Sequence, residues 1–561
     1  MRRLIAAFGL VISACYSSGE GIAPPLDRVY FPVGLTTDCD RRYEPGCTPK
    51  YLYVVSSDFD LQYNAGSVQG IRLDGVRFIV NALGDDPGKH CNDLAGSQLK
   101  LGVQSEADRM IYPGPCKPVD LDKNPDSLGK LLSSNEHTVG IGAFATDVLL
   151  KYGPISPSHP EPRKRLLIPV RGESSLHWID LGENGELKCA QSGSPQKCGK
   201  KHRIGTEETE NLREVIMPPE PYAIAASDAG DAIVVTHQTH GALSLFSQDL
   251  DDGRDGWALG PKLSYVHYLS ATGAVALAAV PESEYVRSLR NSWLMNKSES
   301  YAPDPYPPGF AVVYRNSARI DLVRLFRDEW SAPEQPYLQN LQTVQAAGLR
   351  ANAGDTDSRG MAFDDSARRN EEAECSDVAD VAERDRCLKH AASITVGAYV
   401  SSRSPSSLIV GAAEPALTES ETALGRAFSD TPNKDMPRFD GVFPLPQGAS
   451  RVYVGQIINE QGQPEPRVFV VCYDQRQIAV YDPRRRIIEK YIRTGRGPHA
   501  MAFDFDEADP AAPEQPGYAL GYVGHFLDSY VGVIQLDRRK IRSYGTIVLS
   551  LAQPVAPRAS K

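Results

Sequence analysis

The chain has 561 residues, of which 41% are apolar and 23% are charged, and its net charge is −11. This acidic balance suggests no basic face of the kind that binding to nucleic acid requires. After residue 14 the sequence has no apolar run of about 18 residues, so no membrane-spanning helix is expected there. The length allows several ordinary domains or one large β architecture.

The first residues have the features of an export signal. Two arginines precede a short apolar stretch over residues 4–12, as in a secretory signal peptide over residues 1–14. The run Ile12-Ser13-Ala14-Cys15 resembles the bacterial lipobox, in which the cysteine thiol receives lipid. Ordinary secretion with an incidental cysteine is the alternative. We expect a lipid on Cys15, a flexible tether over residues 15–25 and anchoring in the cell envelope. Tyr16 is not the aspartate that retains enteric lipoproteins at the inner membrane, which favours the outer membrane and leaves periplasmic or surface side open.

The cysteines are consistent with export. Eight of the other nine lie in close pairs, which are Cys39 with Cys47, Cys91 with Cys116, Cys189 with Cys198, and Cys375 with Cys387. In an exported chain such pairs favour local disulfides. Metal thiolates are the alternative, but the sequence contains no C-x-x-C motif. The ninth, Cys472, lies in an apolar stretch and is expected to be a buried, inert thiol.

One pattern of short strands recurs along the chain. A Pro or Gly precedes an apolar strand and a polar turn, and two or three strands of β-branched and aromatic residues follow. The pattern is clear over residues 221–246 and again over residues 498–537, and the tetrapeptide Met-Ala-Phe-Asp occurs at both 361–364 and 501–504. Short strands at recurrent spacing indicate a radial array of β-sheets.

These repeats resemble the YVTN family of β-propellers, whose blades carry a Y-V-T-N step at the end of the second strand. The resemblance implies an all-β, seven-bladed β-propeller over residues 26–552, followed by a disordered tail over residues 553–561. The expected blades are 26–80, 137–190, 213–250, 258–325, 355–412, 440–494 and 495–552. Each blade has roughly 78 residues, more than the usual ~40–50, so long loop insertions are expected. The polar segment 365–391 predicts one short helical insertion, which a disulfide between Cys375 and Cys387 would close.

Aligning the blades on the Y-V-T-N step suggests a candidate site. Its last position is held by Arg171, His237 and His525 in three of the blades, and His499 lies in a connection on the same face. We expect these four residues to converge at one mouth of the central channel. Imidazoles there could bind a metal or transfer protons. The alternative is that they hydrogen-bond the backbone of turns.

Two acidic loops are candidate calcium sites. Asp249, Asp251 and Asp255 alternate with glycines that permit tight turning. A weaker version occurs over residues 58–64, where Asp, Asp, Gln and Asn alternate without a glycine. A solvated acidic turn is the alternative in both cases. No other cofactor is expected.

The sequence lacks several enzyme signatures, namely G-x-S-x-G, H-E-x-x-H, the phosphate-binding loop and C-x-x-C-H. We therefore predict a binding scaffold for an envelope protein or glycan, in contact with the membrane only through its lipid and with no nucleic-acid partner. The alternative is a lactonase-like or quinoprotein-like propeller enzyme, in which Arg171 would hold an anionic substrate. A structural envelope protein without a ligand is a third possibility.

Overall fold

The computed structural model describes the chain from residue 22 to residue 553, apart from residues 45, 95–98, 127–128, 134–135, 154–161, 192–193, 208–211, 249–259, 297–305, 316, 329–334, 346–356, 414–435 and 508–516. The predicted signal peptide, Cys15 and nearly all of the predicted tail lie outside the described residues. None of the described helices is both long and apolar enough to cross a membrane.

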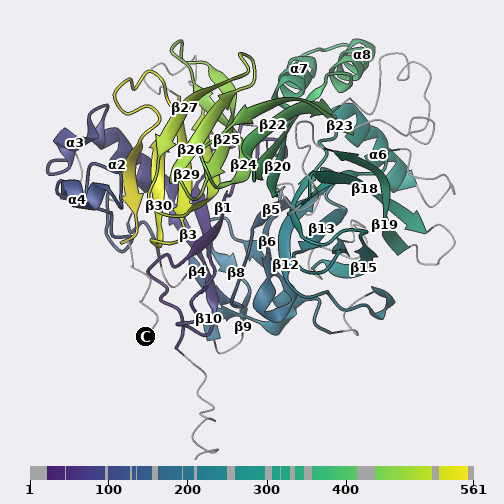
Figure 1. The fold of residues 1–561 in the computed structure, drawn as a ribbon, viewed down its shortest axis with the longest axis horizontal. Helices are drawn as coiled ribbons and strands as arrows, with labels where there is room; N and C mark the ends of the chain where they lie inside the picture. Colours follow the sequence, from purple (N-terminus) through teal and green to yellow (C-terminus); the bar gives the residue numbers. More distant parts are fainter. Residues whose placement is uncertain are drawn as a thin grey trace, which may run out of the picture.

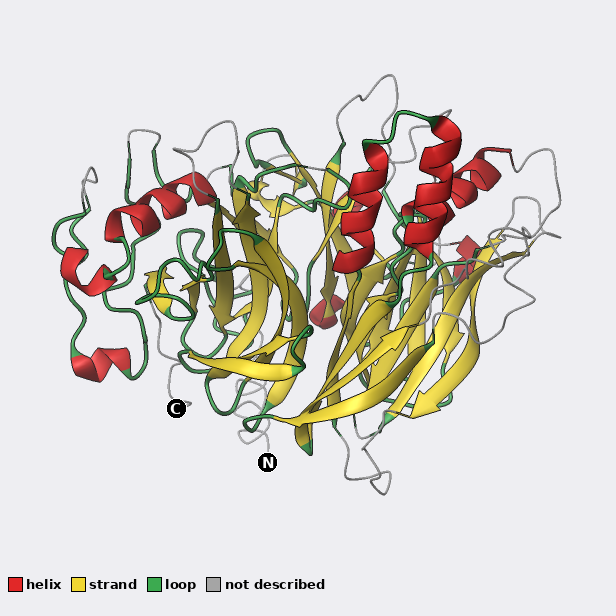
Figure 2. Ribbon diagram, turned by 90° about the horizontal axis from the view of Figure 1, so that it is seen from above, coloured by secondary structure: helices red, strands yellow, loops and turns green. Residues whose placement is uncertain are grey.

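The described residues form seven β-sheets around a common axis, so the chain is a seven-bladed β-propeller, as predicted (Figures 1 and 2). Blades three to seven each contain four antiparallel strands in chain order. Blade three has β12 (Pro221–Ala226), β13 (Ala232–His237), β14 (Ala242–Ser247) and β15 (Lys262–Tyr268). Blade four has β16 (Ala274–Ala279), β17 (Gly309–Tyr314), β18 (Arg319–Asp328) and β19 (Gln335–Gln345). Blade five has β20 (Ser358–Asp364), β21 (Val396–Arg403), β22 (Ser406–Ala413) and β23 (Pro437–Pro444).

The last two blades have the same order. Blade six has β24 (Ala449–Ile458), β25 (Pro464–Cys472), β26 (Gln477–Asp482) and β27 (Ile487–Arg493). Blade seven has β28 (Pro498–Asp506), β29 (Tyr518–His525), β30 (Tyr530–Gln535) and β31 (Ile547–Leu551).

The first blade is extended by strands that come from a later part of the chain, after the first strands of blade two. Blade one has β1 (Pro32–Thr37), β2 (Tyr51–Ser56), β3 (Gly66–Arg72) and β4 (Thr138–Ile141), and β10 (Ser194–Cys198) and β9 (Ala190–Gln191) extend it. Blade two has β5 (Leu149–Tyr152), β6 (Lys164–Val170), β7 (Ser175–Leu181) and β11 (Arg203–Ile204), with β8 (Leu187–Lys188) also paired to β7. Because β10 pairs with β4 in parallel, chain from the second blade covers the outer edge of the first.

The strand sequences reflect their positions in the blades. Every residue of the second strand β13 is buried, because neighbouring blades cover both faces, and its sequence is a continuous apolar run that ends in Thr and His. The outermost strand β23 alternates between more and less exposed residues, because one of its faces meets solvent.

Within the described residues, α-helices occur in three insertions rather than the one that was predicted. The predicted insertion contains α7 (Ser366–Ser376) and α8 (Val381–Ala392). Blade one adds α2 (Leu73–Leu83), α3 (Pro87–His90) and α4 (Glu106–Arg109), and blade four adds α6 (Glu284–Asn296). Figure 1 shows α2, α3 and α4 together at the edge near the yellow last blade, and α6, α7 and α8 together at another edge. The helix α2 is amphipathic, and its buried face joins the core between the first and last blades.

The ring closes where the last blade meets the first. The inner strand β1 contacts both β28 of blade seven and β5 of blade two. At the outer edge, the Val119 amide donates to the Ser550 carbonyl at 2.8 Å and the Val119 carbonyl accepts from the Ala552 amide at 3.0 Å. Residues 26–31, immediately before β1, form no strand. Phe31 has φ +50°, outside the extended region, so the ladder begins only at Pro32, which pairs with Ser56.

Several predicted blade limits also differ from the structure. Residues 138–141 and 262–268 are the outermost strands of blades one and three, whereas the sequence placed them in blades two and four. The turn before an outermost strand has no residues that show which sheet the strand joins. The repeat pattern therefore could not assign these two strands to their blades.

All four predicted disulfides are present, namely Cys39–Cys47, Cys91–Cys116, Cys189–Cys198 and Cys375–Cys387. Cys472 is a free, fully buried thiol, and burial raises its pKa to about 12. The expectation of an inert thiol fits this environment.

Candidate functional site

An aromatic cluster lies on the face of the propeller where the inner strands β1 and β28 begin. Phe31 precedes β1, Phe59 follows β2, Phe144 lies between β4 and β5, and Phe526 follows β29. The Phe59 ring is centred 5.3 Å from the Phe526 ring and 6.1 Å from the Phe144 ring, and Phe31 packs 5.0 Å from Phe526. Connections of blades seven, one and two therefore meet in one apolar cluster.

Part of this cluster faces solvent. Phe59 is 54% exposed and Leu61 of the same loop is 61% exposed, whereas Phe31 beneath them is only 4% exposed. We call the surface formed by Phe59, Leu61, Phe144 and Phe526 the aromatic rim. Exposed apolar groups that adjoin one another make this surface a candidate binding surface.

The backbone of this region is unusual. Phe31, Asp58, Leu61 and Phe144 all have φ between 50° and 60°, a region that side chains of this size rarely occupy. Each such residue costs roughly 1–3 kcal/mol, and residues of this kind concentrate at functional sites. The fold therefore holds Phe59 and Leu61 outward at an energetic cost.

A buried carboxylate supports the loop. Asp58 is 1% exposed, and its Oδ1 accepts from the Tyr63 amide at 3.2 Å. Burial, with a smaller effect of Asp60, raises the pKa of Asp58 to about 7. The Tyr30 hydroxyl donates to Asp60 at 2.6 Å and joins the N-terminal segment to this loop.

Two of the four predicted site residues lie beside the aromatic rim. His499 packs against Phe526 at a centroid distance of 5.9 Å, and its Nδ1 donates to the Val33 carbonyl at 3.1 Å. The amide of Arg171, in the 3₁₀ turn Arg171–Glu173, donates to the Phe144 carbonyl at 3.0 Å. The Arg171 guanidinium pairs with Glu220 at 2.7 Å rather than pointing free into the channel mouth.

The other two are buried under turns. His237 Nδ1 donates to the Pro219 carbonyl at 2.9 Å, so its Nε2 is the atom that accepts from the Ser244 hydroxyl at 2.8 Å. His525 Nε2 accepts from the Gly495 amide at 3.0 Å, and the ring stacks on Tyr530. Burial lowers the pKa of His237 to about 4 and that of His525 to about 3. Both rings are neutral and their acceptor nitrogens are already hydrogen-bonded. These contacts fit the second interpretation of the sequence, in which the histidines hydrogen-bond to turns.

The channel itself is crossed by an ion pair. Arg451 of blade six reaches Asp147, which precedes β5 of blade two, at 2.9 Å, and it donates to the Thr146 carbonyl at the same distance. Burial opposes the charge of Arg451, but the Asp147 carboxylate outweighs it and raises the Arg451 pKa. Because blades two and six are not neighbours, this pair holds opposite sides of the ring together.

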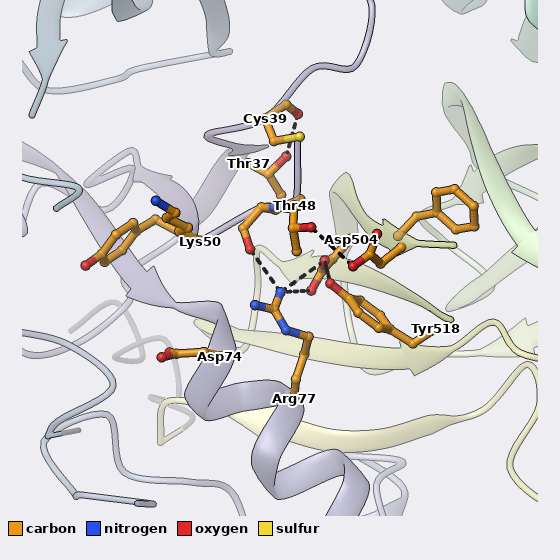
Figure 3. Close-up of polar contacts among 12 residues, drawn as sticks. Thr37, Cys39, Thr48, Lys50, Asp74, Arg77, Asp504 and Tyr518 are labelled. Atoms are coloured by element: carbon orange, nitrogen blue, oxygen red, sulfur yellow. Dashed lines mark hydrogen bonds and ion pairs between the residues drawn. The ribbon is translucent and has the colours of Figure 1, made fainter. Parts of the chain in front are cut away.

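The opposite ends of the inner strands carry a second polar cluster (Figure 3). Asp504 accepts from Arg77 of α2 at 3.0 Å, from the Tyr518 hydroxyl at 3.0 Å and from the Tyr522 hydroxyl at 3.1 Å. Arg77 also donates to the Pro49 carbonyl at 2.9 Å. Asp504 has no exposure and its acceptors are occupied, so this cluster ties α2 and the loop of the first disulfide to blade seven.

The described residues contain no group of three His, Cys, Asp or Glu side chains arranged to hold a metal ion. The predicted calcium residues Asp249, Asp251 and Asp255 lie outside the described residues.

Sequence reasoning missed the aromatic rim. Phe59 and Phe526 each follow the second strand of their blade by one to three residues, and Phe144 lies in the connection before the next blade. Aromatic residues just past the strand ends could have been compared across blades, as the polar ones were. The positive φ angles of Asp58, Leu61 and Phe144 leave no mark in the sequence.

No protein-family model matches the sequence, and no curated protein matches it significantly. Solved structures with a similar fold include the periplasmic gluconolactonase of Pseudomonas aeruginosa, with 11% identity, a TM-score of 0.39 and coverage of 83% of this chain and 86% of that one. A candidate 6-phosphogluconolactonase of Bacteroides fragilis has 11% identity and a TM-score of 0.41, covering 84% and 86%. Hydrazine synthase of Kuenenia stuttgartiensis has 9% identity and a TM-score of 0.41, covering 93% and 99%. At these values the likenesses concern the fold and say nothing of function.

Proposed function

We propose that this protein is a lipid-anchored binding propeller of the bacterial cell envelope, and that its aromatic rim holds a protein or glycan partner. The observation that carries this proposal is the exposure of Phe59 and Leu61 on a backbone held in left-handed conformations. Large apolar side chains that are preorganised on a rigid scaffold lose little freedom on binding, so they suit an anchor in an interface.

The anchoring part of the proposal is supported by the lipobox-like run that ends at Cys15 and by the four disulfides. Disulfides persist in an oxidising compartment such as the bacterial periplasm or cell surface. Cys15 lies seven residues before Ile22, whose carbonyl accepts from the Asn64 amide at 2.9 Å. An anchor at Cys15 would therefore hold the rim within roughly 25 Å of the lipid.

A protein partner is favoured over a glycan. Leu61 is aliphatic and more exposed than Phe59, and aliphatic side chains do not stack on sugar rings as aromatic ones do. The enzyme alternative has less support, because His237 and His525 are buried, neutral and bonded to turn groups.

Site-specific photo-crosslinking in the native envelope tests the proposal. A benzophenone amino acid would replace Phe59 in one variant and Ile541, which is 84% exposed, in a matched control. We expect a discrete crosslinked species from position 59 alone. Digestion of that species by a protease or by glycosidases would identify its class. Equal labelling from both positions would overturn the proposal, and gluconolactone hydrolysis that is lost on Arg171→Ala would favour the enzyme.

A further inference from the structure

The loop that carries Phe59 and Leu61 also carries polar side chains at every second position. These are Asp58, Asp60, Gln62 and Asn64. Calcium-binding loops place oxygen ligands at alternate positions in the same way, beginning with carboxylates. The alternation alone does not make a site, because solvated acidic turns share it.

The structure adds a buried carboxylate oxygen without a donor. Asp58 is 1% exposed, and its Oδ1 accepts from the Tyr63 amide, but its Oδ2 has no hydrogen-bond partner among the described residues. Such an oxygen costs roughly 1–3 kcal/mol unless something satisfies it. A bound ion or an ordered water commonly contacts a buried polar atom that has no hydrogen-bond partner in the protein.

The second carboxylate of the loop lies close by. Asp60 is two residues from Asp58 in one tight turn, in which the Leu61 amide donates to the Asp58 carbonyl at 3.2 Å. The hydrogen bonds to Asp60 come from the Tyr30 hydroxyl at 2.6 Å and from the backbone and side-chain amides of Gln62. All of these donors are neutral, and no Lys or Arg in the described part of the chain forms an ion pair with either carboxylate. The described part of the chain therefore supplies no cationic partner to this pair of carboxyl groups.

We propose that this loop binds a hard divalent cation, calcium by its chemistry, through Asp58 Oδ2 and the Asp60 carboxylate. Backbone or amide oxygens of the loop and water would complete the shell, since calcium takes six to eight oxygen ligands. With only two carboxylates the dissociation constant falls in the weak class of roughly 10⁻⁴–10⁻³ M, which is typical of extracellular modules. The bound ion would fix the turn that presents Phe59 and Leu61. The ion site stands whether or not the rim binds a partner.

Terbium luminescence tests the site, because a nearby tyrosine sensitises this calcium substitute. The Tyr30 hydroxyl touches Asp60 and Tyr63 lies within the loop, so terbium bound there would emit on excitation of tyrosine. The mature protein with Cys15 replaced by Ser would be titrated with Tb³⁺ and then with Ca²⁺. We expect a saturable signal that calcium displaces.

Variants locate the signal. Asp58→Asn with Asp60→Asn should weaken binding by about tenfold or more. The matched control, Asp120→Asn with Asp122→Asn, removes two carboxylates with the same spacing that already pair with Lys123 and Lys130, and it should leave the signal unchanged. The single variant Asp60→Asn, in a partly exposed residue, covers the case in which the double variant fails to fold, and calorimetric titration with Ca²⁺ is its second readout. No saturable signal, or a signal lost only in the control, would overturn the inference. The crosslink at position 59 is read separately, so failure of the ion site is distinguishable from failure of the proposed function.

Discussion

Replacement of the two buried histidines should change how the stability of the protein depends on pH. His237 and His525 have no exposed surface, and burial lowers their pKa from the ordinary 6.5 to about 4 and about 3. Each ring therefore binds a proton more readily in the unfolded chain than in the folded one. Unfolding takes up protons below about pH 6.5, so each histidine stabilises the fold fully above that pH and progressively less as the pH falls.

The magnitude follows from these pKa values. Between pH 7.5 and pH 5.0 each histidine should lower the free energy of unfolding by about 2 kcal/mol, and the pair by about 4 kcal/mol. Other groups titrate in the same window, and Asp58 with its raised pKa acts in the opposite direction. The quantity to compare is therefore the loss between the two pH values in the parent and in the variant.

Urea unfolding at pH 7.5 and pH 5.0 measures this loss. The parent would be compared with His237→Gln, His525→Gln and the double variant. We expect the double variant to lose about 4 kcal/mol less than the parent, whatever its stability at pH 7.5. Identical losses would refute the reasoning. If a variant does not fold, an NMR titration of the parent gives the answer, because both rings should remain neutral down to about pH 5.

Three further outcomes are expected. Leu61→Gly should raise the free energy of unfolding by about 0.5–1 kcal/mol in urea, because glycine accepts the left-handed backbone, and it should weaken crosslinking at the rim. Removing the buried disulfide by Cys91→Ser with Cys116→Ser should cost about 3 kcal/mol, measured by thermal denaturation, since the bridge closes a loop between residues 25 apart. Asp147→Asn should cost about 2 kcal/mol by leaving Arg451 unpaired in the channel, whereas Asp147→Leu combined with Arg451→Met should cost less than either single change.

The fold was predictable because it repeats. The apolar strand patterns at residues 221–246 and 498–537 recur with turns at similar steps, and one blade cannot bury its faces alone. The disulfides were predictable from spacing, and the helices at 366–376 and 381–392 from their polar, helix-prone composition. The outermost strands at 138–141 and 262–268 were misplaced, because long segments separate them from the strands they follow and interrupt the spacing of the repeat.

The candidate site was predictable only in part. The alignment placed Arg171, and the connection between blades placed His499, on the face that carries the aromatic rim, because these strand ends and connections share a face in a propeller. It could not show that His237 and His525 are bonded to turn groups, since burial is a tertiary property. It also missed Phe59 and Leu61, whose exposure depends on backbone angles that sequence patterns do not record.

The most direct test of the central claim is a competition at the aromatic rim. The variant with a benzophenone amino acid at position 59 would be crosslinked in native envelopes with an excess of unlabelled protein as competitor. We predict that the parent and the exposed-residue control Ile541→Ser both suppress the crosslink, and that Phe59→Ser with Leu61→Ser does not. Suppression by the Phe59→Ser/Leu61→Ser variant as strong as that by the parent would contradict the account, because the partner would then be held elsewhere on the propeller.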